Sequence, residues 1–203
     1  MNHNIRRKYT RCNSFFEGHR VTELLGNHDA LVFSDSILKH CYFPNHADLC
    51  AIRGATSDTL INKIRTDDIP WLQYKLVIIH VGTNDVQNGD GLTFINRLPT
   101  LVAEIKVRNP YVHIVFSAII PRLLDHVDTD QIIRRLNGDV KSWCKDRYWA
   151  TFYPTYKTMV YQGLPDLVGN YWADDGLHLK DRGIKRMSQI LKNIVALWRQ
   201  RRL

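Results

Sequence analysis

The stretch that decides the fold is Leu76-Val77-Ile78-Ile79-His80-Val81-Gly82-Thr83-Asn84-Asp85, in which a nearly continuous apolar run ends at a glycine and polar residues. The run does not alternate apolar with polar residues, and Ile114-Val115-Phe116 has the same character. A half-exposed strand would alternate, whereas a strand covered on both faces stays apolar throughout. The stretch therefore indicates a strand of a parallel sheet, with polar groups gathered at its carboxyl end.

Four further short runs are rich in β-branched or aromatic residues, at 30–33, 49–53, 113–119 and 151–153. Between and after them lie apolar stripes at helical spacing, over 92–105 (closed by Asn109-Pro110), 132–143 and 184–198. Strands that alternate with helices imply right-handed crossovers. We expect an α/β protein, a three-layer αβα sandwich around a five-stranded parallel sheet.

The chain has 203 residues, 44% hydrophobic and 24% charged, which is ordinary for a single globular domain. We expect an N-terminal extension over 1–28, partly flexible, with a short helix near Phe15–Leu25, and one domain over 29–203. No segment approaches the roughly 20 apolar residues of a membrane span. The basic start lacks the apolar core of a secretory signal, so we expect an intracellular, cytoplasmic protein.

The formal net charge is +8, and part of it lies in Arg6-Arg7-Lys8 and in Arg199, Arg201 and Arg202 near the ends. Such ends are usually solvated tails, although they could attract RNA or an anionic membrane surface. His40, Cys41, His46 and Cys50 lie near one another in sequence, but their spacing matches no common zinc site. Buried thiols are the favoured interpretation, and we expect no metal and no organic cofactor.

Chemically useful residues follow the apolar runs, and ligands of parallel sheets bind at the carboxyl ends of the strands. Ser34-Asp35-Ser36 follows the first run, Gly54 the second, and Gly82-Thr83-Asn84-Asp85 the third. Asp174-Asp175-Gly176-Leu177-His178 precedes the last helical stripe. A hydroxyl, a glycine, a side-chain amide, and an imidazole with a carboxylate are the parts of an acyl-transfer site.

These four stretches, in this order, resemble the blocks of the SGNH (GDSL-like) hydrolases, over residues 30 to about 195. The resemblance implies a flavodoxin-like SGNH fold and a serine esterase that acts through an acyl-enzyme. It implies that Ser36 is the nucleophile, His178 the general base, and Asp175 the carboxylate that orients the base. It also implies an oxyanion hole formed by the backbone N–H groups of Ser36 and Gly54 and by the side chain of Asn84.

Several points stay open. Ser34 stands where the family's first block usually has glycine, which adds a second hydroxyl and a possible change in loop packing. Asp174 competes with Asp175 for the orienting role, although Asp175 has the family's spacing. Asp35, Thr83 and Arg122 are possible substrate-contacting residues, while Asp35, Thr83 and Asp85 are also interpretable as loop braces. Isolated Ser or Asn residues at strand ends are most often caps.

The finer resemblance is to esterase domains in first-open-reading-frame proteins of non-LTR retrotransposons and to acetylhydrolases, on residues 117–122 and 175–179. It implies short acyl or lipid-like acetyl esters as substrates, and acetylated sugars are a further possibility. Residues 159–172 could provide an apolar wall for an acyl chain, although core packing is the commoner fate of such residues. The alternative function is a binding module for RNA or anionic lipid that keeps the fold without efficient catalysis.

Overall fold

Five parallel strands form the centre of the protein in a computed structural model, which describes residues 28–42, 46–66, 69–89, 91–165 and 170–203. The strands lie in the order β2 (Asp48–Ala51), β1 (Ala30–Ser34), β3 (Leu76–His80), β4 (His113–Ser117) and β5 (Ala150–Tyr153). Each neighbouring pair is parallel. The predicted five-stranded parallel sheet is confirmed. The helix expected near 15–25 lies outside the described residues.

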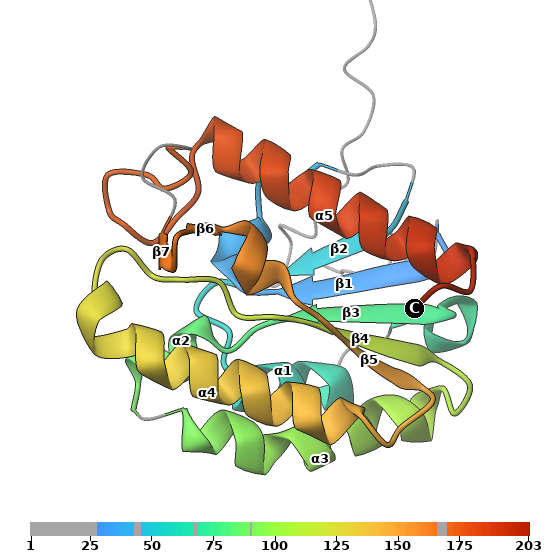
Figure 1. The fold of residues 1–203 in the computed structure, drawn as a ribbon. Coiled ribbons are helices and arrows are strands. Elements are labelled where there is room, and N and C mark those ends of the chain that lie inside the picture. Colours follow the sequence, from blue (N-terminus) through green and yellow to red (C-terminus); the bar gives the residue numbers. More distant parts are fainter. Residues whose placement is uncertain (1–27, 43–45, 67–68, 90, 166–169) are drawn as a thin grey trace, which may run out of the picture.

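Helices cover both faces of the sheet (Figure 1). On one face lie α1 (Ser57–Thr66), α3 (Leu92–Arg108) and α4 (His126–Cys144), and on the other lies α5 (Asp181–Arg199). Because successive strand residues point to opposite faces, Leu31 and Phe33 pack toward α1 and α3, while Val32 packs toward α5. Both faces of each strand need apolar residues, which explains the continuous runs in the sequence.

The remaining elements are short. They are η3 (Ser36–Leu38), η4 (Trp71–Gln73), α2 (Thr83–Gln87), η5 (Thr155–Thr158) and the two-stranded β6 (Val160–Tyr161) and β7 (Leu164–Pro165). Strands β2, β3 and β4 end two, one and two residues earlier than the predictions 49–53, 76–81 and 113–119. The residues after each strand therefore belong to loops at the carboxyl edge of the sheet, where η3 and α2 begin.

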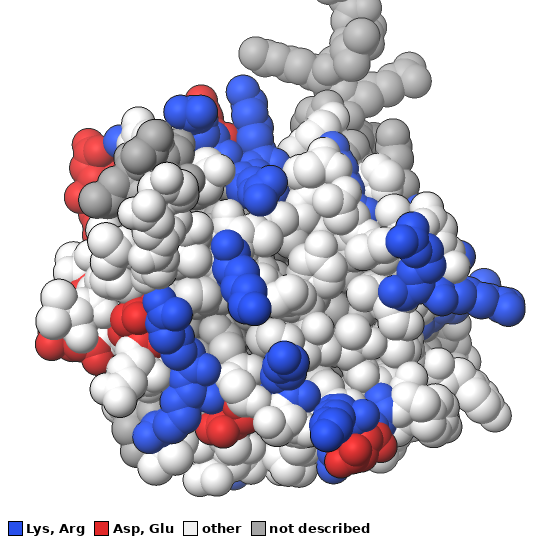
Figure 2. Space-filling view, in the orientation of Figure 1, with Lys and Arg blue, Asp and Glu red and all other residues white. Residues whose placement is uncertain are grey.

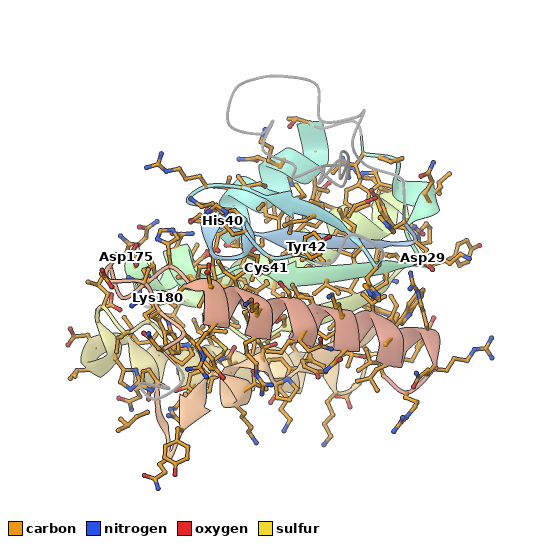
Figure 3. The ribbon with its side chains drawn as sticks, turned by 90° about the horizontal axis from the view of Figure 1, so that it is seen from above. Asp29, His40, Cys41, Tyr42, Asp175 and Lys180 are labelled. Atoms are coloured by element: carbon orange, nitrogen blue, oxygen red, sulfur yellow. The ribbon has the colours of Figure 1, made fainter. Side chains whose placement is uncertain are left out.

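The two ends of the sheet carry different contacts. Figure 3 shows Asp29 at one end of the molecule and Asp175 and Lys180 at the other. At the Asp29 end, Arg199 of α5 forms an ion pair with Asp29 at 2.7 Å, so this basic residue is neutralised. Figure 2 shows Lys and Arg in separate groups, interspersed with Asp and Glu, over the face that it presents. Within the described residues, no helix has the length and apolar character needed to cross a bilayer.

Candidate active site

Ser36, His178 and Asp175 lie in one hydrogen-bonded row, although 142 residues separate the first two. The Ser36 Oγ is 3.1 Å from His178 Nε2, and His178 Nδ1 is 2.7 Å from Asp175 Oδ2. An ionised carboxylate only accepts hydrogen bonds, so the neutral imidazole carries its proton on Nδ1 and presents Nε2 as an acceptor to the serine hydroxyl. The arrangement matches a nucleophile, a base and an orienting acid.

The Asp175–His178 segment organises itself. Asp175 Oδ1 accepts hydrogen bonds from the backbone N–H groups of Leu177 and His178, each at 2.9 Å. The hydrogen bond from His178, followed by those backbone bonds, lowers the pKa of Asp175 to about 2, so this carboxylate is ionised at neutral pH. Asp174 instead faces solvent and pairs with Lys180 at 3.2 Å. Asp175, with the predicted spacing, is therefore the carboxylate next to the imidazole.

Gly176 fixes where this segment packs. Its φ of +65° lies in the left-handed region that favours glycine, and its carbonyl accepts a hydrogen bond from Leu124 N at 2.9 Å. A Cβ at this position would lie 2.7 Å from Leu124 N. No larger residue fits without moving one of the two loops, so the base segment is seated directly against the loop that follows β4.

Ser36 begins η3 directly after β1, and the buried Asp35 caps this turn. Asp35 Oδ1 accepts the Ile37 N–H at 2.9 Å. The helix is only three residues long, so its dipole contributes little to activating Ser36. Burial raises the pKa of Asp35 to about 7, against the lowering effect of the Ile37 bond.

Asn84 and Gly54, the predicted oxyanion donors, flank the same loop. Asn84 Nδ2 donates to the Ala55 carbonyl at 2.9 Å and is 3.5 Å from Asp35 Oδ2, the limit of hydrogen-bond distance. Gly54 has a φ of +65° and is exposed, and a Cβ there would have no heavy atom within 4 Å. Backbone conformation rather than crowding therefore favours glycine here. The first Asn84 contact ties the amide to the Gly54 loop.

Asp85 secures the neighbouring helix. Its carboxylate accepts the Ser57 backbone N–H, with 3.1 Å to each oxygen, and the Ser57 hydroxyl at 2.5 Å. Ser57 is the first residue of α1, so Asp85 supplies from α2 the acceptor that a helix N-terminus needs. The loops after β2 and β3 are thus joined by Asn84 on one side and Asp85 on the other.

The three residues expected as possible substrate contacts are all buried. Asp35, Thr83 and Arg122 are 1%, 3% and 2% exposed. Arg122 Nη1 donates to the Thr83 carbonyl at 3.0 Å, and its other nitrogens bind Asp125. In this conformation the Asp35 carboxylate and the Arg122 guanidinium bond protein atoms, as bracing residues do, and Thr83 takes part through its backbone carbonyl.

A polar row that sequence reasoning missed lies under the carboxyl edge of the sheet. His80 Nδ1 is 3.1 Å from Ser117 Oγ, which is 2.6 Å from Thr155 Oγ1. Burial lowers the pKa of His80 to about 4. Ser34, the departure from the family block, pairs with His80 in the strand register; its hydroxyl has no hydrogen-bond partner among the described residues. The sequence signal that could have predicted this row is a polar residue at the last position of three apolar strands, namely Ser34, His80 and Ser117.

The segment expected as an acyl wall divides into two environments. Met159 and Trp172 are 0% and 3% exposed and belong to the core on the α5 face. Tyr161 and Leu164, on β6 and β7, are instead 61% and 58% exposed. Core packing is thus the role of the first pair, and residues 166–169 lie outside the described part. Cys41 and Cys50 are buried, and the described residues contain no cluster of three His, Cys, Asp or Glu suited to a metal ion.

Comparisons with known proteins concern the family and the fold of this chain. The sequence pattern of the GDSL-like Lipase/Acylhydrolase family matches residues 13–186. A proposed acylhydrolase from Bacteroides fragilis is similar, with a TM-score of 0.68 at 19% identity over 96% of this chain and 98% of that one. A GDSL-like lipase from Bacteroides thetaiotaomicron gives 0.63 at 20% identity over 83% and 88%.

A member of the lipolytic G-D-S-L family from Veillonella parvula gives a TM-score of 0.63 at 18% identity, over 86% of this chain and 98% of that one. These identities are low, so the structural likeness concerns the fold. No match was found among curated proteins.

Proposed function

Since the chain belongs to the GDSL-like lipase/acylhydrolase family, we propose that it hydrolyses carboxylic esters through an acyl-enzyme on Ser36. The observation that carries this proposal is the 3.1 Å contact between Ser36 Oγ and His178 Nε2, together with the 2.7 Å contact between His178 Nδ1 and Asp175. In a Ser–His–carboxylate row the serine oxygen can act as a nucleophile, since the neighbouring base takes the hydroxyl proton at the moment of attack.

In the first half-reaction Ser36 Oγ attacks the ester carbonyl carbon while His178 Nε2 accepts the hydroxyl proton. His178 then gives this proton to the oxygen of the leaving alcohol as the single bond between that oxygen and the former carbonyl carbon breaks. In the second half-reaction water attacks the acyl-enzyme, with His178 again as the base, and releases the carboxylic acid. Asp175, ionised at neutral pH, stabilises the imidazolium in both steps.

The tetrahedral intermediate carries its negative charge on the former carbonyl oxygen. The backbone N–H groups of Ser36 and Gly54 and the Asn84 amide would donate to it. Asn84 can do so by giving up the 3.5 Å contact with Asp35 while keeping its 2.9 Å bond to Ala55. The short bond holds the amide in place, and the long one leaves an N–H for the oxyanion.

A short acyl group, such as acetyl, is the substrate class that the site favours. Met159 and Trp172, at the two ends of the segment that could have provided an apolar wall for an acyl chain, are buried in the core. Extending the acyl chain into that region would require the core to open, which costs roughly 25 cal/mol for each Å² of apolar surface exposed. Lipid-like acetyl esters and acetylated sugars both present such a group.

The test is hydrolysis of a short-chain aryl ester by the Ser36→Ala protein, together with labelling by a fluorophosphonate probe. We expect both to be abolished while circular dichroism and the melting temperature stay near the wild type. Ser142→Ala, an exposed serine of α4, is the control and should behave as the wild type. Ser34→Ala should retain labelling, because Ser34 Oγ is buried and has no hydrogen-bond partner among the described residues.

Full activity in Ser36→Ala would refute the assignment. Absence of labelling in the wild type, with RNA or anionic-vesicle binding that weakens with salt, would instead support the alternative of a binding module. The hydrogen-bonded Ser36–His178 pair favours the enzyme, since a module has no need for that geometry.

A further inference from the structure

Arg122, in the loop between β4 and α4, is the largest of the fully buried side chains among the described residues. Placing a guanidinium in a protein interior is costly unless its charge is paired and its donors are occupied. A buried arginine therefore needs an acceptor for its donors, and the acceptors of Arg122 show which segments it joins.

Arg122 reaches two segments at once. Its Nε and Nη2 donate to the two carboxylate oxygens of Asp125 at 2.8 and 2.7 Å, a planar two-point contact. Its Nη1 donates to the Thr83 carbonyl at 3.0 Å, across 39 residues of sequence. Thr83 directly precedes Asn84, so the guanidinium fixes the backbone that carries the proposed oxyanion amide.

The same loop also holds the base segment. Leu124 N donates to the Gly176 carbonyl, which lies between Asp175 and His178 in sequence, at 2.9 Å. The position of Leu124 depends on both ends of its short loop, and Asp125 at one end is the N-terminal cap residue of α4. Asp125 is anchored in turn by Thr129, whose hydroxyl donates to the Asp125 carbonyl at 2.9 Å.

We propose that Arg122 is a positioning residue that sets the distance between the oxyanion amide of Asn84 and the catalytic base His178. This inference rests on the proposed ester hydrolysis. Arg122 acts on Asn84 through the Thr83 carbonyl and on His178 through Asp125, Leu124 and Gly176. Burial is the largest influence on the pKa of Asp35, beside Ser36, and raises it; the Arg122 cation partly opposes that rise, which places its charge within electrostatic reach of the nucleophile loop.

Lysine cannot replace arginine in this role. A single ammonium can occupy the Asp125 carboxylate or the Thr83 carbonyl, but it lacks the rigid fork that meets a carboxylate at two points while a third nitrogen points elsewhere. Arg122→Lys thus keeps the buried charge and removes the geometry, whereas Arg122→Gln removes both.

Arg134 is a matched control. Its Nε pairs with Asp130 Oδ2 at 2.6 Å and its Nη2 donates to the Gly163 carbonyl at 2.7 Å, so it too joins a carboxylate to a distant carbonyl. Its side chain is 47% exposed, its carboxylate partner lies one turn earlier on α4, and its carbonyl partner lies on the β6–β7 turn. Arg134→Lys tests the loss of a similar bridge that does not connect the two parts of the active site.

The experiment compares kcat and KM for a short-chain aryl ester in wild type, Arg122→Lys, Arg122→Gln and Arg134→Lys. We expect kcat to fall about 10- to 100-fold in Arg122→Lys, since a misplacement of ~1 Å costs about that much, with KM within about threefold of wild type. Arg134→Lys should stay within about twofold. If Arg122→Gln does not fold, Asp125→Asn breaks the same two-point contact and should lower kcat in the same direction.

A double-mutant cycle separates positioning from general loosening. If Arg122 acts through Asn84 as well as His178, then Arg122→Lys should lower kcat by a smaller factor in an Asn84→Ala background than in the wild type, because one of the two groups that it positions is gone. An undiminished loss in the Asn84→Ala background would overturn the inference, as would equal kcat values for Arg122→Lys and Arg134→Lys. Faster amide exchange at residues 83–85 and 176–178 in Arg122→Lys alone would support it.

These outcomes are distinguishable from failure of the proposed function. If Ser36→Ala keeps wild-type activity, ester hydrolysis by Ser36 is wrong whatever Arg122 does. If Ser36→Ala is inactive while Arg122→Lys is fully active, the enzyme stands and the positioning role of Arg122 is wrong.

Discussion

The two halves of the proposed active site are built in opposite ways. The base half, Asp175 and His178, has side chains 52% and 37% exposed, and the Asp175 carboxylate accepts hydrogen bonds from Leu177 and His178, two and three residues away. The oxyanion half around Asn84 is braced by Asp85 and Arg122, which are buried and bond to residues 28 and 39 positions away. One half is local and exposed, and the other is long-range and buried.

This difference separates chemistry from stability. An exposed carboxylate contributes little to the free energy of unfolding, because water replaces its contacts, but it can contribute strongly to catalysis. A buried brace does the reverse, since removing it leaves donors without acceptors in a place that water does not reach. Substitutions in the base half should therefore lower kcat, whereas substitutions of the buried braces should lower the free energy of unfolding.

The largest expected effect is on catalysis, in Asp175→Asn. The asparagine keeps the size of the side chain but no longer requires Nδ1 of His178 to carry the proton and no longer stabilises the imidazolium. We expect kcat to fall about 10³- to 10⁴-fold, as in triads whose acid is replaced by its amide, with the melting temperature almost unchanged. Steady-state kinetics and thermal unfolding measure the two quantities.

Asp174→Asn is the control for that prediction. Asp174 pairs only with the Lys180 side chain in this structure, from a 99% exposed position, and should give wild-type kcat. A loss of activity in Asp174→Asn with little loss in Asp175→Asn would reverse the assignment of the orienting carboxylate.

The second effect is on stability, in Asp85→Ala. This change leaves the Ser57 N–H and hydroxyl without their acceptor at the buried start of α1, and we expect the free energy of unfolding to fall by about 3 kcal/mol. Chemical denaturation measures it. Asp58 lies on the same helix, α1, and forms an exposed ion pair with Arg97 of α3. Asp58→Ala breaks this pair and should cost less than about 1 kcal/mol. Equal losses in the two variants would contradict the buried brace.

The smallest effect concerns pH. Burial lowers the pKa of His80 to about 4 in the folded protein, below the ordinary 6.5 that the unfolded chain has. Between these values only the unfolded chain binds the proton, so acidification favours unfolding. His80 should account for about 2 kcal/mol of stability lost between pH 7 and pH 5. His80→Asn, which retains a polar atom near Ser117, should lose that much less than wild type over the same range.

Asp35 makes the comparison between variant and wild type necessary. Its folded pKa of about 7 lies above the ordinary 3.8, so its contribution to stability is present at low pH and is lost as the pH rises toward 7, opposite in sign to that of His80. Only the difference between His80→Asn and wild type isolates the histidine. Identical pH slopes in the two proteins would show that His80 is not the buried neutral group described.

The sequence predicts the local half of the site better than the buried half. Asp175 and His178 are three residues apart, so their contact is local, and the family's spacing favours Asp175 over Asp174. The apolar runs predict the five strands because buried parallel strands need apolar residues on both faces. The bonds of Asn84 to Ala55 and of Arg122 to Thr83 depend on how separate loops meet. No periodicity within one segment encodes that meeting.

Arg122 is an example of a site residue whose burial the sequence does not predict. In the sequence it is a charged residue after a strand, and charged residues in loops are usually exposed, so contact with substrate was a reasonable expectation. Its burial becomes visible only when α4 and α2 are packed together. Asn137 is similar, since it lies within the apolar stripe of α4 and binds both the N–H and the carbonyl of Ile119.

The separation of Ser36 and His178 by 142 residues has a consequence for how the protein is made. On the ribosome the nucleophile, in η3 just after β1, is synthesised before the base, which lies in the segment that precedes α5. A nascent or truncated product that ends before Asp175 would carry the oxyanion half without the base that removes the serine proton. Hydrolysis would then begin only once the fold is complete. A chain divided at the β6–β7 turn would give two inactive fragments, and their association could be measured as recovered esterase activity.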